Sequence, residues 1–231
     1  LTRTMLPVFE KLVSVLDEGR DCVVLTTIRT DGSTRKSLYE SDGSVIESGG
    51  GDADPGATVE IIRSLNPRTT AHTTKSETEE RIFEFIESDP PLVIFGGGHV
   101  GKAVALYAAA AGFNVTVVDD RPEFANRERF PGVRAVVCER FDGAMDKVPL
   151  TGKSYVVIVT RGHRHDEAVL EACMRFRPIY IGMIGSRRKV SLTFGRLEQA
   201  GIPKERLAGV HAPIGLPIGA RTAEEIGISI V

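Results

Sequence analysis

The residues best suited to chemistry form three clusters, and the first is a run of glycines. Residues 96 to 101 read GGGHVG, so Gly96, Gly98 and Gly101 match the pattern G-x-G-x-x-G. The first glycine permits a tight turn, the second lets a phosphate approach the backbone, and the third lets a helix pack closely on a strand. N–H groups at the start of the next helix attract an anion. We therefore expect a phosphate site that includes Gly97, with His99 in its wall rather than as a metal ligand. A tight turn without a ligand is the alternative.

Acidic residues follow the glycine run at a distance typical of dinucleotide-binding proteins. The apolar segment NVTVVDD ends in Asp119 and Asp120, and Arg121 comes next. The carboxylate of Asp119 could accept a hydrogen bond from a ribose hydroxyl. Arg121 either pairs with Asp119 or favours a ligand that carries a 2′-phosphate. Asp120 can be a solvated turn residue.

The second cluster is the segment TRGHRHD, which follows the apolar run SYVVIV. Thr160 and Arg161 come directly after this run, and the guanidinium of Arg161 could bind a phosphate through two hydrogen bonds. His163 and His165 could donate hydrogen bonds, transfer protons or bind a metal. We expect Asp166 to cap the N-terminus of the next helix. The alternative is a capped loop with exposed histidines.

The third cluster is the segment GSRRK, which follows the apolar run PIYIGMI. Gly185 and Ser186 provide a flexible backbone and a hydroxyl group, and Arg187, Arg188 and Lys189 bring three cations to the end of one strand. These cations could bind a phosphate, and a solvated basic turn is the alternative. No catalytic residue is identified in any of the three clusters.

All three clusters follow apolar segments that alternate with helical ones over residues 91 to 231. Strands are expected at PLVIF, NVTVVDD, RAVVC, SYVVIVT and PIYIGMI, and helices at KAVALYAAAAG, HDEAVLEACMRF and KVSLTFGRLEQAG. Continuously apolar strands separated by helices predict a parallel sheet that is covered on both faces, here a Rossmann-like domain. Ligands of such sheets bind at the carboxyl ends of the strands, where the three clusters lie.

The part of the chain before residue 91 is expected to form a second, smaller N-terminal α/β domain over residues 1 to 65. The segment TMLPVFEKLVSVLDE has the apolar spacing of an amphipathic helix, and DCVVLTTI is typical of a strand. TDGSTRKS has the composition of a turn, and a hairpin is expected around Asp42 and Gly43. Residues 66 to 90 are interpreted as a linker and a connecting helix.

Composition excludes several classes of protein. The 231 residues are 42% hydrophobic and 26% charged, as in soluble globular proteins, and the net charge of −2 offers no basic surface for nucleic acid. The three cysteines have no disulfide or zinc-binding spacing, so no metal site is predicted. No apolar segment is long enough to span a membrane and no signal peptide opens the chain, so we expect a cytoplasmic protein.

Five motifs in this order, GGGHVG, VVDDRPEF, TRGHRHD, IGMIGSRRK and HAPIGLPIGARTAEEI, resemble the xanthine dehydrogenase accessory factor (XdhC/CoxI) family. The resemblance covers residues 91 to 231 closely. In the first part of the chain, VVLTTIRTDGSTRKS and DGSVIESGGG are similar to the small first domain of the family. Family members usually carry a Gly-Cys-Gly segment between the two domains, and this chain has none.

The resemblance implies a maturation factor for molybdenum hydroxylases such as xanthine dehydrogenase. Such a factor binds molybdenum cofactor (molybdopterin), protects it while a cysteine desulfurase-type partner supplies the terminal sulfur, and delivers it to the apoenzyme. It would act as a cofactor-binding chaperone rather than as a turnover enzyme, and we expect a homodimer. The phosphate of molybdopterin suits the glycine run or the three cations of the third cluster.

Two other functions are compatible with the motifs. An NAD(P)-dependent oxidoreductase would bind its dinucleotide between Gly96 and Asp119 and use His163 as a proton donor. That function leaves the three cations and the small first domain without a role. A regulatory domain that senses nucleotides would also account for the glycine run. The compound that co-purifies with the protein would separate these possibilities.

Overall fold

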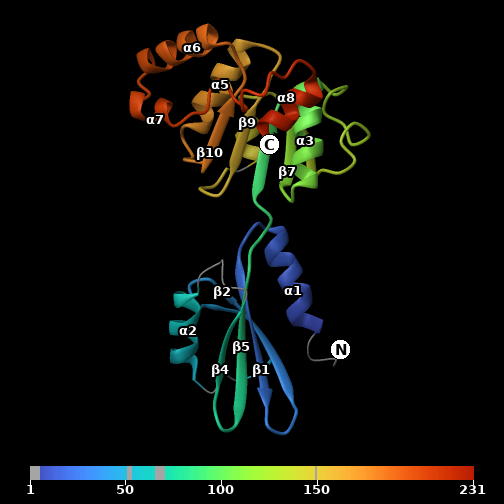
Figure 1. The fold of residues 1–231 in the computed structure, drawn as a ribbon, viewed down its shortest axis with the longest axis vertical. Helices are drawn as coiled ribbons and strands as arrows, with labels where there is room; N and C mark the ends of the chain where they lie inside the picture. Colours follow the sequence, from blue (N-terminus) through green and yellow to red (C-terminus); the bar gives the residue numbers. More distant parts are fainter. Residues whose placement is uncertain (1–5, 51–53, 66–70, 149) are drawn as a thin grey trace. The chain divides into compact units, whose positions relative to one another are not determined.

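A computed structural model describes residues 6–50, 54–65, 71–148 and 150–231 of the chain. The chain divides into two compact units between Asp89 and Pro90, and each unit has its own five-stranded sheet (Figure 1). The two sheets differ in strand direction, so each unit is described separately. In the described part of the chain, every helix is too short or too polar to cross a membrane.

The first unit is built on an antiparallel sheet with the strand order β3-β2-β1-β5-β4. Its elements are α1 (Leu6–Asp17), β1 (Cys22–Arg29), β2 (Thr34–Glu40), β3 (Val45–Ser48), α2 (Pro55–Ser64), β4 (His72–Lys75) and β5 (Glu79–Ile86).

Both faces of this sheet are covered, which explains why β1 is apolar along its length. Successive side chains of a strand point to opposite faces. Val24 of β1 packs with α1, whereas Val23 packs with Ile62 of α2. Figure 1 shows α1 and α2 on opposite sides of the sheet.

Two expectations for this unit are wrong. The segment TDGSTRKS is not only a turn, because β2 begins at Thr34 within it. In place of a linker and a connecting helix, residues 72–75 and 79–86 form strands β4 and β5, and β5 pairs with β1 along its whole length. Aromatic and β-branched residues such as Phe83 fit a half-buried sheet surface. The expected hairpin is present, since Ser44 donates a backbone hydrogen bond of 2.8 Å to Asp42 and β2 pairs with β3.

The second unit contains the Rossmann-like sheet that the apolar segments predict. Its strands are β6 (Pro91–Phe95), β7 (Asn114–Asp119), β8 (Ala135–Cys138), β9 (Tyr155–Ile158) and β10 (Tyr180–Met183). Its helices are α3 (His99–Ala110), α4 (Ala144–Lys147), α5 (His163–Cys173), α6 (Arg187–Gln199), α7 (Lys204–Ala208) and α8 (Ala223–Ile230).

All pairs in this sheet are parallel, and the strand order is β10-β9-β6-β7-β8. The chain runs outward from β6 to β8 and then returns to the other side of β6 to form β9. Ligands of open α/β sheets bind where the strand order reverses, at the carboxyl ends of the strands. This switch point lies between β6 and β9, so the glycine run and TRGHRHD are neighbours in space.

The core of the second unit lies on both faces of the sheet. On one face Ile94 packs with Val104 of α3, and on the other Phe95 packs with Leu170 of α5. Alternate residues of one strand therefore serve different layers, which is why the strands are continuously apolar.

Candidate functional site

The glycine turn after β6 is held in place by close backbone contacts. Gly96 has a φ of 117°, a conformation that favours glycine, and a side chain on it would collide with the backbone of Val159. A side chain on Gly97 would collide with the carbonyl of Phe124. In contrast, a Cβ atom on Gly98 would have no atom within 4 Å. Gly96 and Gly97 thus serve packing, whereas Gly98 faces open space that a ligand can enter.

Helix α3 begins directly at this turn. Its N-cap is Gly98, which provides no side-chain hydrogen bond to the first N–H groups of the helix. Gly101 lies so close to the carbonyl oxygen of Gly96 that any side chain there would push the helix away from β6. The side chain of His99 is exposed. The uncapped N–H groups beside an open space form the kind of helix end that binds anions.

Both side-chain oxygens of Asp119 accept hydrogen bonds within the glycine turn. Its side chain is only 1% exposed, and its two oxygens accept four hydrogen bonds, one from the backbone of Gly97 and three from Arg121. Burial alone would raise the pKa of Asp119, but the hydrogen bonds from Arg121 and Gly97 lower it below its usual value. Of the two roles considered for Arg121, pairing with Asp119 is the one that the structure shows. Ribose binding by Asp119 has no support here.

A residue that sequence reasoning missed, Arg129, also holds the glycine turn. Its Nε donates a hydrogen bond of 2.9 Å to the carbonyl of Gly97, while its Nη2 is buried without a hydrogen-bond partner. The centroid of the Phe124 ring lies 3.7 Å from Cζ of Arg121 and 5.1 Å from Cζ of Arg129. In the sequence, the segment RPEFANRERF has an aromatic residue with arginines on both sides, and this pattern could have indicated these contacts.

The cluster after β9 is organised by Asp166. Oδ1 of Asp166 accepts hydrogen bonds from both the backbone N–H and the hydroxyl of Thr160, at 3.1 and 2.6 Å. Asp166 is therefore not the helix cap that we expected: α5 begins at His163 and its N-cap is Gly162. The carboxylate instead ties the first turn of the helix to the end of the strand. The His163 side chain lies outside the described part of the structure, and His165 packs edge-on against Phe141.

The cluster after β10 forms the N-terminus of α6. Ser186 is its N-cap and accepts a hydrogen bond of 3.3 Å from the backbone of Lys189, and Gly185 has a φ of 159°. Arg187, Arg188 and Lys189 occupy the first turn, and all three side chains are exposed. Within the residues that the structure describes, none of the three forms an ion pair. Cations are unfavourable at the positive end of the helix dipole, so an anion bound there would stabilise this turn.

The β9 and β10 clusters share a cavity of about 250 Å³ at the carboxyl edge of the sheet. It combines a carboxylate, two hydroxyls and two cations with an apolar floor, as in sites that orient a polar ring. Its lining is Thr160, Arg161, Gly162, Asp166, Met183, Ile184, Gly185, Lys189, Val190 and Thr193. The glycine turn is next along the same edge, so the structure brings the three predicted clusters to one edge of the sheet.

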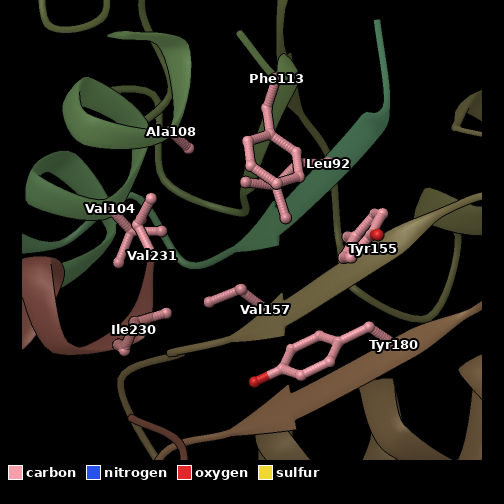
Figure 2. Close-up of a pocket in the computed structure, with 9 residues that line it drawn as sticks. All are labelled: Leu92, Val104, Ala108, Phe113, Tyr155, Val157, Tyr180, Ile230 and Val231. Carbon is pink, nitrogen blue, oxygen red and sulfur yellow. The ribbon is translucent and has the colours of Figure 1, made fainter. Parts of the chain in front are cut away.

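A second cavity, of about 160 Å³, contains none of the predicted site residues (Figure 2). It is lined by Leu92, Val104, Ala108, Phe113, Tyr155, Val157, Tyr180, Ile230 and Val231. The lining is apolar apart from the two tyrosine hydroxyls, and burial raises the pKa of Tyr180. It has no charged side chain for a phosphate, so we place the candidate site at the carboxyl edge instead.

Two of the three cysteines are unsuited to chemistry. Burial raises the pKa of Cys22 to about 11 and that of Cys173 to about 12, so both thiols stay protonated at neutral pH. Cys138 is exposed at the carboxyl end of β8. Among the described residues, no group of three histidine, cysteine or acidic side chains is placed to hold a metal ion.

Comparison with known families identifies the second unit. Residues 92–231 match the family model described as the XdhC Rossmann domain. The chain belongs to the XdhC family. The likeness that the five motifs indicated is thereby confirmed, and so is the Rossmann domain that the apolar strands predicted.

Three curated relatives resemble this XdhC-family chain. It is 28% identical over 97% of its length to the uncharacterized protein YqeB of Escherichia coli (strain K12). It is 28% identical over 67% of its length to a probable xanthine dehydrogenase subunit from Bacillus subtilis (strain 168). It is 24% identical over 61% of its length to the molybdenum cofactor insertion chaperone PaoD of Escherichia coli (strain K12). The chain spans 45%, 45% and 37% of these relatives, which is less than half of each.

A solved structure supports the fold of the whole chain. A protein from Bacillus halodurans described as a xanthine dehydrogenase superposes with a TM-score of 0.74 at 21% identity. The match covers 99% of this chain and 65% of that protein. At this level of identity the likeness shows the fold alone.

Proposed function

We propose that this XdhC-family chain is an accessory factor that binds molybdenum cofactor and assists its insertion into a xanthine dehydrogenase-type hydroxylase. One observation carries the proposal: the first turn of α6 presents Arg187, Arg188 and Lys189 without an acidic partner in the described structure. These cations stand at the carboxyl edge of a parallel sheet, where such folds bind their ligands. A site with unneutralised cations at a helix N-terminus calls for an anionic ligand.

The residues at this edge fit the chemistry of molybdopterin, which has a phosphate and a polar ring system. The cations of α6 and Arg161 can bind the phosphate through charge-assisted hydrogen bonds. The cavity beside them offers the hydroxyl of Thr160 and the carboxylate of Asp166, which suit the donors and acceptors of a pterin ring. The glycine turn provides a second place for a phosphate, with Gly98 open and α3 uncapped.

When bound, the cofactor would supply the metal centre that the client enzyme uses in catalysis. The chain's own residues would hold and shield it. Asp166 keeps Thr160 in place at the end of β9, and Ser186 caps the N-terminus of α6, whose Lys189 lines the cavity. No catalytic residue is assigned. The thiols of Cys22 and Cys173 are buried, and burial raises the pKa of both, so neither is exposed to accept sulfur from a partner.

We further propose that sulfur is installed by a separate cysteine desulfurase-type donor and that the apo-hydroxylase is the recipient. The likeness to PaoD, a molybdenum cofactor insertion chaperone, supports delivery of the cofactor. We also propose a homodimer. Three exposed apolar side chains near the end of the chain, Leu216, Ile218 and Ile228, would be buried by a partner.

An NAD(P)-dependent oxidoreductase is the rival function, and the geometry of Asp119 speaks against it. In dinucleotide-binding proteins the acidic residue after the second strand binds the ribose. Here both oxygens of Asp119 are occupied by Gly97 and Arg121. A dinucleotide would have to displace a buried network of four hydrogen bonds.

The test is reconstitution of a xanthine dehydrogenase-type apoenzyme with cofactor and the Arg187→Ala, Arg188→Ala double variant. Each charge-assisted hydrogen bond contributes about 1.5–3 kcal/mol, so loss of two should weaken cofactor binding by about a hundredfold or more. Activation of the hydroxylase should fall accordingly, while hydroxylase that is already mature is unaffected.

A matched control removes two exposed arginines at the opposite edge of the sheet, Arg134 before β8 and Arg175 at the end of α5. Arg134→Ala with Arg175→Ala should activate the hydroxylase as well as wild type. Wild-type activation by the Arg187, Arg188 variant would disprove the proposal. Substrate-dependent NAD(P)H turnover by the purified protein would favour the oxidoreductase.

A further inference from the structure

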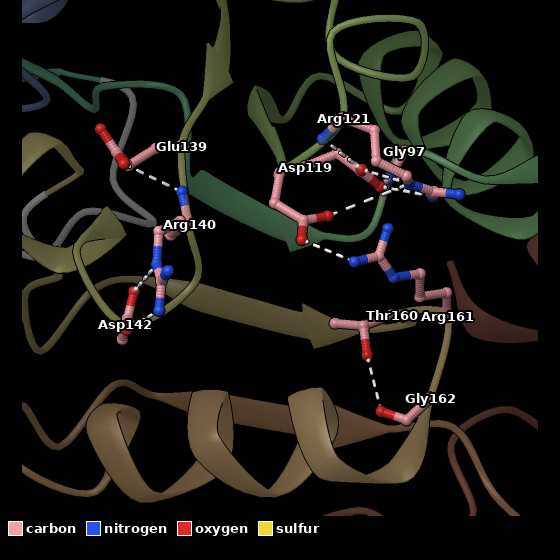
Figure 3. A network of polar contacts seen from close by, with 10 residues as sticks. Gly97, Asp119, Arg121, Glu139, Arg140, Asp142, Thr160, Arg161 and Gly162 are labelled. Atoms are coloured by element: carbon pink, nitrogen blue, oxygen red, sulfur yellow. Dashed lines mark hydrogen bonds and ion pairs between the residues drawn. The ribbon is translucent and has the colours of Figure 1, made fainter.

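An ion pair spans the carboxyl end of β6, directly at the glycine turn. Asp120 follows the last residue of β7, and Arg161 follows β9 by three residues. In the sheet, β6 lies between these two strands. The Nη2 atom of Arg161 nevertheless lies 2.8 Å from Oδ2 of Asp120. Strands two positions apart are separated by about 10 Å, so the arginine bridges the width of the intervening strand. Figure 3 shows the Arg161 side chain extending from the end of β9 past the tip of β6.

The two partners of the pair differ in exposure. Asp120 is 17% exposed in its side chain, and its Oδ1 atom is buried without a hydrogen-bond partner. Arg161 is 43% exposed, so the cation faces solvent and the carboxylate faces the protein. Oδ1 of Asp120 also lies 3.9 Å from Nε of Arg121. The carboxylate therefore keeps a cation beside it if Arg161 leaves.

A carboxylate and a phosphate offer an arginine the same bidentate geometry. We infer that Asp120 competes with the phosphate of the ligand for Arg161. The carboxylate holds Arg161 across the glycine turn and releases it when a phosphate binds. The inference rests on the proposed anion site at this edge and adds a residue that sets its selectivity. A weak anion gains too little to displace the carboxylate, whereas a phosphate with more charge and more oxygens does so.

The contacts favour such an exchange. A single hydrogen bond of 2.8 Å holds the half-exposed Arg161 to Asp120. A phosphate carries more charge and offers the guanidinium more oxygen atoms than one carboxylate does. The free energy that holds Asp120 to Arg161 is subtracted from the binding of every ligand that uses the arginine.

The experiment is calorimetric titration of the full chain with inorganic pyrophosphate, comparing wild type with Asp120→Asn. Asparagine keeps the size of the side chain but removes its charge. The variant should bind pyrophosphate about tenfold more tightly, which corresponds to about 1.4 kcal/mol. The matched control is Glu18→Gln, which removes the carboxylate of the exposed pair of 3.2 Å between Arg20 and Glu18 in the first unit and should leave affinity unchanged.

Combining Asp120→Asn with Arg161→Ala separates competition from simple charge repulsion. If Asp120 acts by holding the arginine, its substitution should give no gain once Arg161 is absent. A tenfold gain that persists in the Arg161→Ala background would overturn the inference, because repulsion would then explain it. Weaker binding by Asp120→Asn alone would also overturn it and make Asp120 a ligand of the bound molecule.

Failure of the proposed site is distinguishable from failure of this inference. If wild type binds pyrophosphate, Gly98→Val does not, and Asp120→Asn binds as wild type does, then the anion site stands and the competitor role falls. If neither wild type nor Asp120→Asn binds pyrophosphate, both fall together.

Discussion

Gly98→Val tests whether a phosphate approaches the glycine turn. A Cβ atom at Gly98 would meet no atom within 4 Å, so the added side chain enters open space. Its φ of −65° and ψ of −166° lie in the extended region that valine adopts readily. The remaining structural cost is that of a poorer helix N-cap, about 1 kcal/mol. For a unit of this size, such a loss lowers the unfolding temperature by about 2–4 °C.

The effect on binding should be much larger than the effect on folding. A phosphate that accepts two hydrogen bonds from the turn would lose both when valine fills its place. At about 1.5–3 kcal/mol each, affinity should fall by a hundredfold or more. Isothermal titration of pyrophosphate, alongside thermal unfolding followed by circular dichroism, measures the two quantities on the same sample.

Gly101→Ala is the matched comparison, because it places a smaller side chain at a packed position of the same turn. Its methyl group would collide with the carbonyl oxygen of Gly96, so α3 must move away from β6. Overpacking of this kind costs about 1–3 kcal/mol, so this variant should be the less stable of the two. Unchanged pyrophosphate binding by Gly98→Val, or equal loss of stability in the two variants, would refute the reasoning.

Two further outcomes follow from the buried groups. Asp119→Asn should destabilise the folded protein by about 1–3 kcal/mol at pH 7, because the hydrogen bonds from Arg121 and Gly97 lose their charged acceptor while Arg121 keeps only the longer contact of 3.9 Å to Asp120. The lowered pKa of Asp119 means that its contribution is present above the unfolded-state value near 4 and is lost as pH falls through the folded-state value. Urea denaturation at pH 7 and pH 3 should therefore show a smaller difference between variant and wild type at pH 3, and a constant difference would contradict this. Titration of the native protein with a thiol reagent at pH 8 should label exposed Cys138 rapidly and leave Cys22 and Cys173 unlabelled until the protein unfolds. Rapid labelling of all three cysteines would contradict the burial seen here.

The sequence by itself determined the five strands of the second unit, its helices α3, α5 and α6, and their order along the chain. Apolar runs such as PLVIF and SYVVIV became buried strands, and each functional cluster was expected where a strand ends. For β6 and β7, and for β9 and β10, strand direction follows from the intervening helix, since a helical crossover makes neighbouring strands parallel. These features are local, and spacing along the chain is enough to predict them.

Composition alone did not predict the strands at residues 72–75 and 79–86. The segment EERIFEFI mixes charged residues with apolar ones, so its local pattern admits a helix as well as a strand. Pairing with β1 on one side and β4 on the other settled its state. Tertiary context of this kind routinely overrides intrinsic preference.

Only the tertiary structure decided which side chains meet at the edge of the sheet. Asp119 turned inward to Gly97 and Arg121, and Asp166 bonded Thr160 instead of capping its helix. The pairing of Arg161 with an aspartate 41 positions earlier depends on β7 and β9 flanking β6. The physical reason is that hydrogen bonds and ion pairs act over a few ångströms in space. The order of the strands in the sheet sets those distances. The spacing of apolar residues along the chain does not reveal that order.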